Sequence, residues 1–227
     1  MSLLLVAHGT RKQRGVTMVG DLVHKVSAAL GQQVHVAFVD VLGPTPTEVL
    51  QSLDDRPVVV VPAFLSRGYH VSADIPAHVA ASGHPDVTVT EALGPGPQLV
   101  RVLADRLIES GWRRGDSVIL AAAGTSDPMA QRDLHMMATW LSATTGSRVE
   151  LAFAATGAPR VHDAVALMRH RGARRVVVAS YLLSEGLFQD RLRTSGADVV
   201  TEPLGLHPGL VRLIASRFRR ARVAVAA

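Results

Sequence analysis

Short apolar runs rich in valine and leucine alternate with longer segments of helical spacing along the whole chain. Parallel strands covered by helices on both faces have this continuous apolar character, so the alternation predicts an α/β fold with parallel sheets. The expected strands are residues 2–7, 34–39, 57–62, 87–91, 117–122, 149–153, 175–180 and 198–201. The expected helices are residues 15–30, 71–82, 96–110, 127–144, 160–171 and 208–220.

The pattern occurs twice. Four blocks recur in the same order: Ala7-His8-Gly9-Thr10 with Ala122-Ala123-Gly124-Thr125, Val36-Ala37-Phe38 with Leu151-Ala152-Phe153, Phe64–Gly68 with Leu182–Gly186 after a small shift, and Gly94 and Leu99–Leu103 with Gly205 and Leu210–Ile214. Eight strands could close one barrel, but the repeat favours two similar domains, each a four-stranded parallel sheet with helices on both faces. The polar segment 110–116 would then join a domain of residues 1–111 to a domain of residues 116–227.

Two histidines of the first repeat lie between the end of a predicted strand and the start of the next predicted helix. His8 follows the first strand, and His70 follows the third strand and its loop. With the strand order 2-1-3-4 these strands are neighbours, and open α/β sheets bind ligands at the carboxyl ends of their strands. The second repeat has Ala123 and Phe188 at the matching places, so the fold does not require the histidines. Imidazole binds late first-row divalent metals and accepts protons near neutral pH, which makes the pair a candidate functional site.

Other polar residues fall on the same predicted sheet edge. Asp40 ends the second strand and could be a third metal ligand, an orienter of a histidine, or an exposed turn carboxylate. Glu91 ends the fourth strand and leaves the same alternatives open, although its counterpart Glu202 favours a structural role. Gly9 and Gly68 would let the backbone turn sharply or approach a flat ligand. Cationic side chains of the two histidine loops would suit a multiply negative substrate or be ordinary solvated charges: Arg11, Lys12, Arg14 and Arg67.

Composition limits the possible metal ligands, the cellular location and the partners of this protein. The 227 residues include no cysteine, so any metal must be held by nitrogen and oxygen ligands. No apolar run is long enough to cross a membrane, and no secretory signal is recognised, so a cytoplasmic protein is expected. The net charge is +5, but only 4% of the residues are aromatic. The C-terminal arginines are interpreted as the solvated end of a helix. Nucleic acid is therefore not an expected partner. The common nucleotide-binding and hydrolase motifs are absent from the sequence.

Three blocks of the first repeat carry a resemblance to a known family: Leu5-Val6-Ala7-His8-Gly9-Thr10-Arg11, then Phe38-Val39-Asp40 with Pro44-Thr45-Pro46, then Val60-Val61-Pro62-Ala63-Phe64-Leu65 with Gly68-Tyr69-His70-Val71 and Asp74-Ile75-Pro76. They resemble the sirohydrochlorin chelatases, the class II chelatases that insert cobalt or iron into sirohydrochlorin for cobalamin or siroheme. The resemblance spans the whole chain, duplication included. Thr10 stands where the family most often has serine, and the second repeat lacks both histidines.

The resemblance implies two chelatase-like domains with the tetrapyrrole in the cleft between them, and a second repeat that only walls this cleft. It implies that His8 and His70 bind the metal and accept pyrrole protons, with Asp40 as a further candidate ligand. Ferrous or cobaltous ion would be a substrate, with no organic cofactor, and the chain would be a monomer or homodimer. The residues expected to contact the tetrapyrrole are Gly9, Thr10, Arg11, Arg67, Gly68 and Tyr69.

The residues alone leave two competing functions open. The first is a metal or tetrapyrrole carrier that uses the same cleft without turnover. The second is an enzyme for another small acid, in which the histidines act as acid and base without a metal. Neither the choice between iron and cobalt nor that between the siroheme and cobalamin pathways is decided by the sequence.

Overall fold

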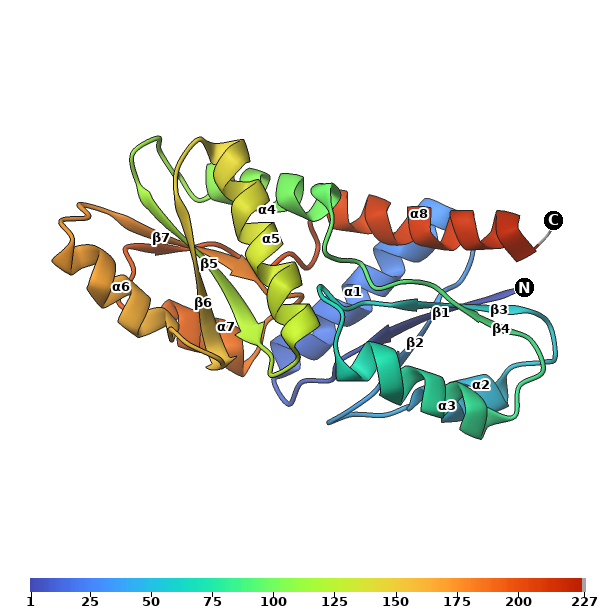
Figure 1. The fold of residues 1–227 in the computed structure, drawn as a ribbon. Helices are drawn as coiled ribbons and strands as arrows, with labels where there is room; N and C mark the ends of the chain where they lie inside the picture. The colour runs from blue at the N-terminus through green and yellow to red at the C-terminus, as the bar shows by residue number, and fades with distance from the viewer. Residues whose placement is uncertain (226–227) are drawn as a thin grey trace. The chain divides into compact units, whose positions relative to one another are not determined.

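A computed structural model, which describes residues 1–225, contains two parallel sheets of four strands each (Figure 1). The order of the first sheet is β2-β1-β3-β4 and that of the second is β6-β5-β7-β8. The strands are β1 (Ser2–Ala7), β2 (His35–Phe38), β3 (Val58–Pro62), β4 (Val87–Val89), β5 (Ser117–Gly124), β6 (Val149–Thr156), β7 (Val176–Tyr181) and β8 (Val199–Val200). The predicted fold class of two duplicated four-stranded parallel sheets is therefore confirmed.

The helices follow the predicted alternation, with two additions. They are α1 (Gln13–Leu30), α2 (Pro46–Ser52), α3 (Ile75–Ser82), α4 (Pro97–Glu109), α5 (Pro128–Thr145), α6 (Val161–His170), α7 (Leu187–Arg193) and α8 (Pro208–Val225), and a π-helical turn, η1 (His70–Asp74), precedes α3. The short helices α2 and α7 were not predicted. None of these helices combines the length and apolar character needed to cross a membrane.

The strand registers show that the two sheets are built alike. Val6 pairs with Pro62 in the first sheet, and Ala121 pairs with Ser180 in the second, as the sequence repeat predicts. The match continues beyond the strands: the N–H of Ser72 donates to the carbonyl of Gly68, and the N–H of Asp190 donates to that of Gly186. Residues of one repeat can therefore be compared with their counterparts in the other.

The compact units of the structure exchange their last helices relative to the sequence repeats. The first unit comprises Met1–Gly94 and the segment from Leu206 onward, whereas the second comprises Pro95–Gly205. Thus α8, from the end of the second repeat, packs on α1 and β3 of the first unit. The counterpart helix α4 packs on α5 and β7 of the second unit. The predicted boundaries, 1–111 and 116–227, follow the repeat in sequence, whereas packing assigns these two helices the other way.

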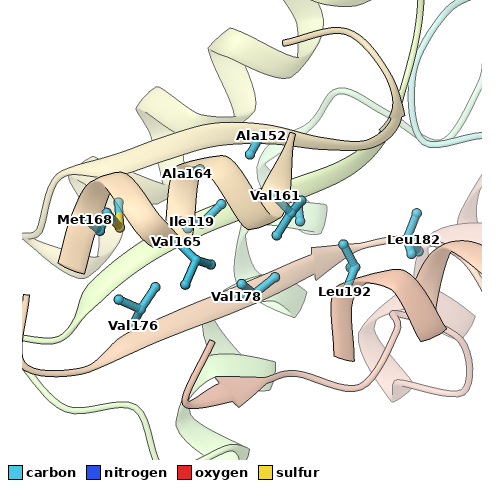
Figure 2. Packing of buried hydrophobic residues seen from close by; sticks show 11 residues of the cluster. Ile119, Ala152, Val161, Ala164, Val165, Met168, Val176, Val178, Leu182 and Leu192 are labelled. Atoms are coloured by element: carbon cyan, nitrogen blue, oxygen red, sulfur yellow. The ribbon is translucent and has the colours of Figure 1, made fainter. Parts of the chain in front are cut away.

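Each sheet is covered on both faces by apolar side chains. In the first unit Leu4 and Val6 of β1 pack with Val49 of α2 and Ile75 of α3. Alternate residues point to opposite faces of a strand, so Leu3 and Leu5 face the other side. Figure 2 shows the corresponding cluster of the second unit, where side chains of β5, β6 and β7 meet those of α6 and α7. Burying one such large aliphatic side chain contributes about 1.5–3 kcal/mol, so both sheets form a stable platform for the loops at their edges.

Candidate functional site

The two candidate histidines lie together at the carboxyl edge of the first sheet. His8 follows β1 directly, and His70 opens η1 after the loop that leaves β3, the strand next to β1. Their ring centroids are 5.0 Å apart, and the rings meet edge to face at 85°. Parallel neighbouring strands end at the same edge, which is why two residues far apart in sequence meet here.

Both imidazoles leave the same nitrogen available. Nδ1 of His8 lies 2.8 Å from the carbonyl oxygen of Gly9. Nδ1 of His70 lies 2.5 Å from Oδ2 of Asp74. A carbonyl or an ionised carboxylate only accepts hydrogen bonds, so Nδ1 is the donor in both rings. Nε2 of each ring then keeps its lone pair, and this pair of nitrogens can bind a divalent metal ion or accept protons.

Asp74 is a site residue that the sequence reasoning did not single out. It belongs to the block Asp74-Ile75-Pro76, which carries part of the family resemblance but predicts no role for this carboxylate. The available signal was its spacing from His70, because residues i and i+4 of a helical segment lie on the same side.

Asp40 lies near the pair but is not joined to it as a third ligand. Its Oδ2 is 3.9 Å from Nε2 of His8, its side chain is 62% exposed, and its Oδ1 accepts the N–H of Val41. Within residues 1–225, no group of three or more histidine, aspartate or glutamate side chains is placed to hold a metal ion together. The role of Asp40 stays a prediction, and two histidines alone form the candidate metal-binding pair.

Aromatic and loop side chains surround the histidines. The ring of Phe64 lies 5.8 Å from that of His70, and the ring of the exposed Tyr69 lies 6.2 Å from it. Arg11 and Arg67 are exposed residues of the β1–α1 and β3–η1 loops. Thr10 accepts the N–H of Lys12 and so shapes its own loop. The two loops carry the histidine pair at one edge of the sheet, and contact of their side chains with a substrate stays a prediction.

Glu91 has a structural contact instead. Its exposed carboxylate lies 3.5 Å from Nη1 of Arg217 on α8. Its counterpart Glu202 lies 3.1 Å from Nη2 of Arg193 in the second unit. Both glutamates thus pair with arginines, and the role of Glu91 stays a prediction.

The two glycines expected at the site, Gly9 and Gly68, differ in whether the surrounding structure leaves space for a side chain. A Cβ atom on Gly9 would lie 2.1 Å from the carbonyl oxygen of Asp40, a distance that forces the backbone to move. A Cβ atom on Gly68 would meet nothing within 4 Å. Gly9 therefore allows β1 to pass close to the loop after β2, whereas Gly68 is not required by packing.

Replacing Gly9 with alanine is expected to lower the free energy of unfolding by about 1–3 kcal/mol, because the backbones at Gly9 and Asp40 must separate. Denaturant unfolding measures this change. Gly20→Ala is the matched control: the added Cβ meets nothing within 4 Å on α1, and alanine in a helix should stabilise by about 0.5–1 kcal/mol. Equal stability of Gly9→Ala and Gly20→Ala would contradict the close approach.

The matching edge of the second unit carries none of these polar groups. Ala123 stands at the place of His8, and Phe188 at that of His70. Leu192 matches Asp74, and Ala155-Thr156 lie where the first unit has Asp40 and Val41. The candidate histidine pair therefore has no counterpart at the matching positions of the second repeat.

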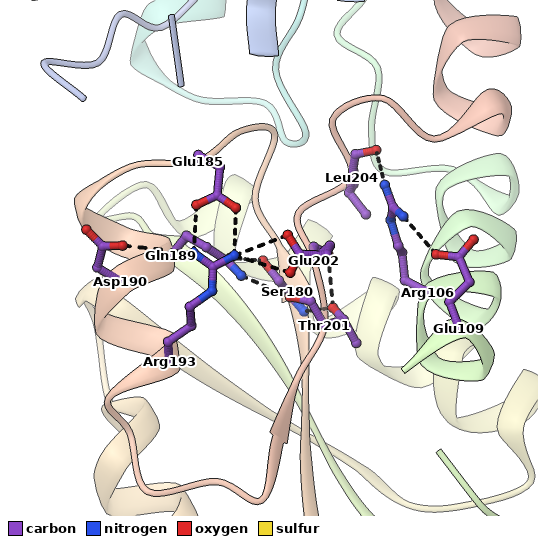
Figure 3. A network of polar contacts seen from close by, with 10 residues as sticks. All are labelled: Arg106, Glu109, Ser180, Glu185, Gln189, Asp190, Arg193, Thr201, Glu202 and Leu204. Atoms are coloured by element: carbon purple, nitrogen blue, oxygen red, sulfur yellow. Dashed lines mark hydrogen bonds and ion pairs between the residues drawn. The ribbon is translucent and has the colours of Figure 1, made fainter. Parts of the chain in front are cut away.

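An ion-pair network occupies this part of the second unit instead (Figure 3). The guanidinium of Arg193 donates to both carboxylate oxygens of Glu185, at 2.7 and 2.6 Å, and Arg193 also pairs with Glu202. The bidentate contact with Arg193 lowers the pKa of the nearly buried Glu185 carboxyl below its ordinary value of 4.5. The network ties the loop before α7 to α7 itself and to the end of β8.

Glu185→Gln should lower the free energy of unfolding at neutral pH by roughly 1.5–3 kcal/mol, since the charged hydrogen bonds are lost. Because the folded-state pKa is lowered, this stabilisation is present above the ordinary pKa of 4.5 and is lost as the pH falls through the lowered value. Urea unfolding should therefore be measured at neutral pH and at a pH below the lowered pKa of Glu185. The stabilities of the wild-type protein and Glu185→Gln should converge in acid. Glu150→Gln, which breaks the more exposed pair with Arg148, is the control and should have the smaller effect. A constant difference across this pH range would contradict the role of Glu185.

The fold is thus a pair of duplicated α/β units, and the carboxyl edge of the first unit carries the two imidazoles. The sequence profile of the CbiX family matches residues 2–110 and again residues 117–221, so the chain belongs to this family. A sirohydrochlorin ferrochelatase of Priestia megaterium is 23% identical over 96% of this chain and 89% of its own length. A sirohydrochlorin cobaltochelatase of the same species is 29% identical over 84% of this chain and 67% of its own length. The structure of SirB from Bacillus subtilis with Fe3+ has the same fold, with a TM-score of 0.83 and 19% identity over 96% of this chain and 94% of that one.

Proposed function

We propose that this protein is a sirohydrochlorin chelatase, an enzyme that inserts a divalent metal ion into the sirohydrochlorin macrocycle. The observation that carries this proposal is the pair of imidazoles at one sheet edge, each with Nδ1 engaged and Nε2 available. Family membership supports it, because two curated relatives are named as chelatases of this tetrapyrrole. The metal ion is a substrate in this reaction and must leave the protein again.

A site of two histidines suits a metal ion that is handed on. Closed sites of four protein ligands hold metals for structural purposes, whereas fewer ligands leave positions open to a reacting molecule. The macrocycle nitrogens would supply the remaining ligands as the metal enters. Two N–H protons must leave the macrocycle in the same process, and a neutral imidazole with a free lone pair on Nε2 can accept a proton.

The polar loops would bind the rest of the substrate. We assign the anionic side chains of the macrocycle to Arg11 and Arg67, because guanidinium groups pair well with carboxylates. Thr10 and Tyr69 belong to the segments that carry the two histidines, and Gly68 adds no side chain there. Asp40 would attract the incoming cation from its exposed position near His8.

Ferrous and cobaltous ions are both proposed as substrates, since the curated relatives include a ferrochelatase and a cobaltochelatase. An anaerobic assay that follows the absorbance of sirohydrochlorin with each ion should show insertion faster than the spontaneous reaction and many turnovers per protein molecule. Binding of one equivalent without turnover would instead show a tetrapyrrole or metal carrier. Turnover of sirohydrochlorin without any added metal would overturn the chelatase assignment.

A further inference from the structure

His70 is held from one side by a carboxylate that is itself partly shielded from water. Nδ1 of His70 and Oδ2 of Asp74 are 2.5 Å apart, and the two side chains are only 35% and 25% exposed. A charge-assisted hydrogen bond is shorter and stronger than a neutral one, and partial burial strengthens it further. The contact therefore restrains both the rotation of the imidazole and the position of its proton.

The local backbone places Asp74 for this contact. In η1 the N–H of Ile75 donates to the carbonyl of His70, five residues back, and such π turns occur frequently at functional sites. Ile75 is fully buried and anchors the turn in the core of the first unit. An aspartate just before a helix often accepts a backbone N–H, but the side chain of Asp74 makes no such bond with α3. Its carboxylate is used for the imidazole and not for capping the helix.

The second repeat shows that the fold does not need a carboxylate at this position. Leu192, the counterpart of Asp74, is 0% exposed and belongs to the hydrophobic cluster of the second unit (Figure 2). Phe188 replaces His70 in the same repeat, and α7 there is a regular α-helix without the π turn. The imidazole, the carboxylate and the turn that joins them are present together in one repeat and absent together in the other.

We propose that Asp74 is a positioning residue that fixes His70 as the Nδ1–H tautomer, so that Nε2 carries the lone pair for the substrate metal ion. Nδ1 of His70 makes its hydrogen bond to Oδ2 of Asp74, and the neighbouring ring of Phe64 has no polar acceptor that could replace it. His8 obtains the same tautomer from a backbone carbonyl, whereas His70 depends on a side chain. The part of this proposal that concerns the metal rests on the proposed chelatase function. The part that concerns the tautomer of His70 is independent of that function.

The test compares three substitutions in the full chain. Asp74→Leu copies the second repeat, Asp74→Ala removes the acceptor without added bulk, and Asp74→Asn keeps an acceptor oxygen. Proton–nitrogen NMR of protein labelled with 15N-histidine reports the tautomer of His70, whose signals are assigned by their loss in His70→Ala. Titration with cobaltous ion reports metal affinity. Asp21→Ala, an exposed aspartate of α1, is the control, and thermal unfolding verifies the fold of each variant.

Asp74→Leu and Asp74→Ala should populate the Nε2–H tautomer of His70 and weaken cobalt binding about 10–100-fold, as the loss of a ligand-orienting partner typically does. Asp74→Asn should keep the Nδ1–H tautomer and recover most of the affinity. An unchanged tautomer in Asp74→Ala, or equal losses in Asp74→Ala and Asp74→Asn, would overturn the assignment. A protein that shows the expected tautomers but no metal insertion would refute the chelatase function while supporting the role of Asp74.

Discussion

His8→Ala and His70→Phe are each expected to lower the rate of metal insertion into sirohydrochlorin about 100-fold or more, because each removes a metal ligand and proton acceptor. Both substitutions copy the second repeat, where Ala123 and Phe188 occupy the matching places. The side chains of His8 and His70 are 47% and 35% exposed, so their loss leaves no sealed cavity. Phenylalanine at position 70 can also keep the packing against Phe64. The fold should therefore survive while the chemistry is lost.

Stopped-flow or steady-state absorbance traces of sirohydrochlorin with ferrous or cobaltous ion measure the rate of metal insertion, after subtraction of the spontaneous rate. His24→Ala is the matched control, because His24 is an exposed histidine of α1 outside the site. The double variant should be little worse than either single variant, since the two residues act on the same metal ion. If both variants kept the activity of His24→Ala, the histidine pair would not be the site of metal insertion.

The histidine pair could be anticipated because its geometry follows from strand order. A parallel sheet of order 2-1-3-4 places the ends of its first and third strands together, and the sequence marks both ends with histidine. The helix α2 could also have been found, since Thr45 and Glu48 form a capping box with Pro46 at the first turn. Its seven residues are too few for a clear helical period, which is why the apolar pattern missed it.

Other features have no signature in sequence periodicity. The π turn of η1 is defined by i→i+5 hydrogen bonding, such as that from Ile75 to His70, and nothing in the residues from His70 to Asp74 distinguishes it from an ordinary helical turn. The role of Asp74 is a different case, because its i, i+4 spacing from His70 was a usable signal. The exchange of α4 and α8 was hidden for a different reason. Both helices are amphipathic, and an apolar face reveals that a helix is packed but not which sheet it packs on.

The exchange of α4 and α8 predicts which of the two units a substitution in either helix destabilises. Phe218 of α8 and Leu107 of α4 are counterparts in the two repeats, and both are 0% exposed. Truncating either to alanine should cost about 3–5 kcal/mol for phenylalanine and 2–5 kcal/mol for leucine, through lost burial and a residual cavity. By sequence position Phe218 belongs to the second repeat, but its helix packs on α1 and β3 of the first unit.

Amide hydrogen exchange of the full-length variants locates these losses. Phe218→Ala should accelerate exchange in β1, β3 and α1 and leave β5 and β7 protected, because local opening follows the unit that lost its contacts. Leu107→Ala should do the reverse, and the two variants serve as controls for one another. Chelation should fall with Phe218→Ala at temperatures where the first unit opens, since β1 and β3 carry the histidine pair. Faster exchange in β5 and β7 of Phe218→Ala, with β1 and β3 unchanged, would show that α8 stabilises its own repeat after all.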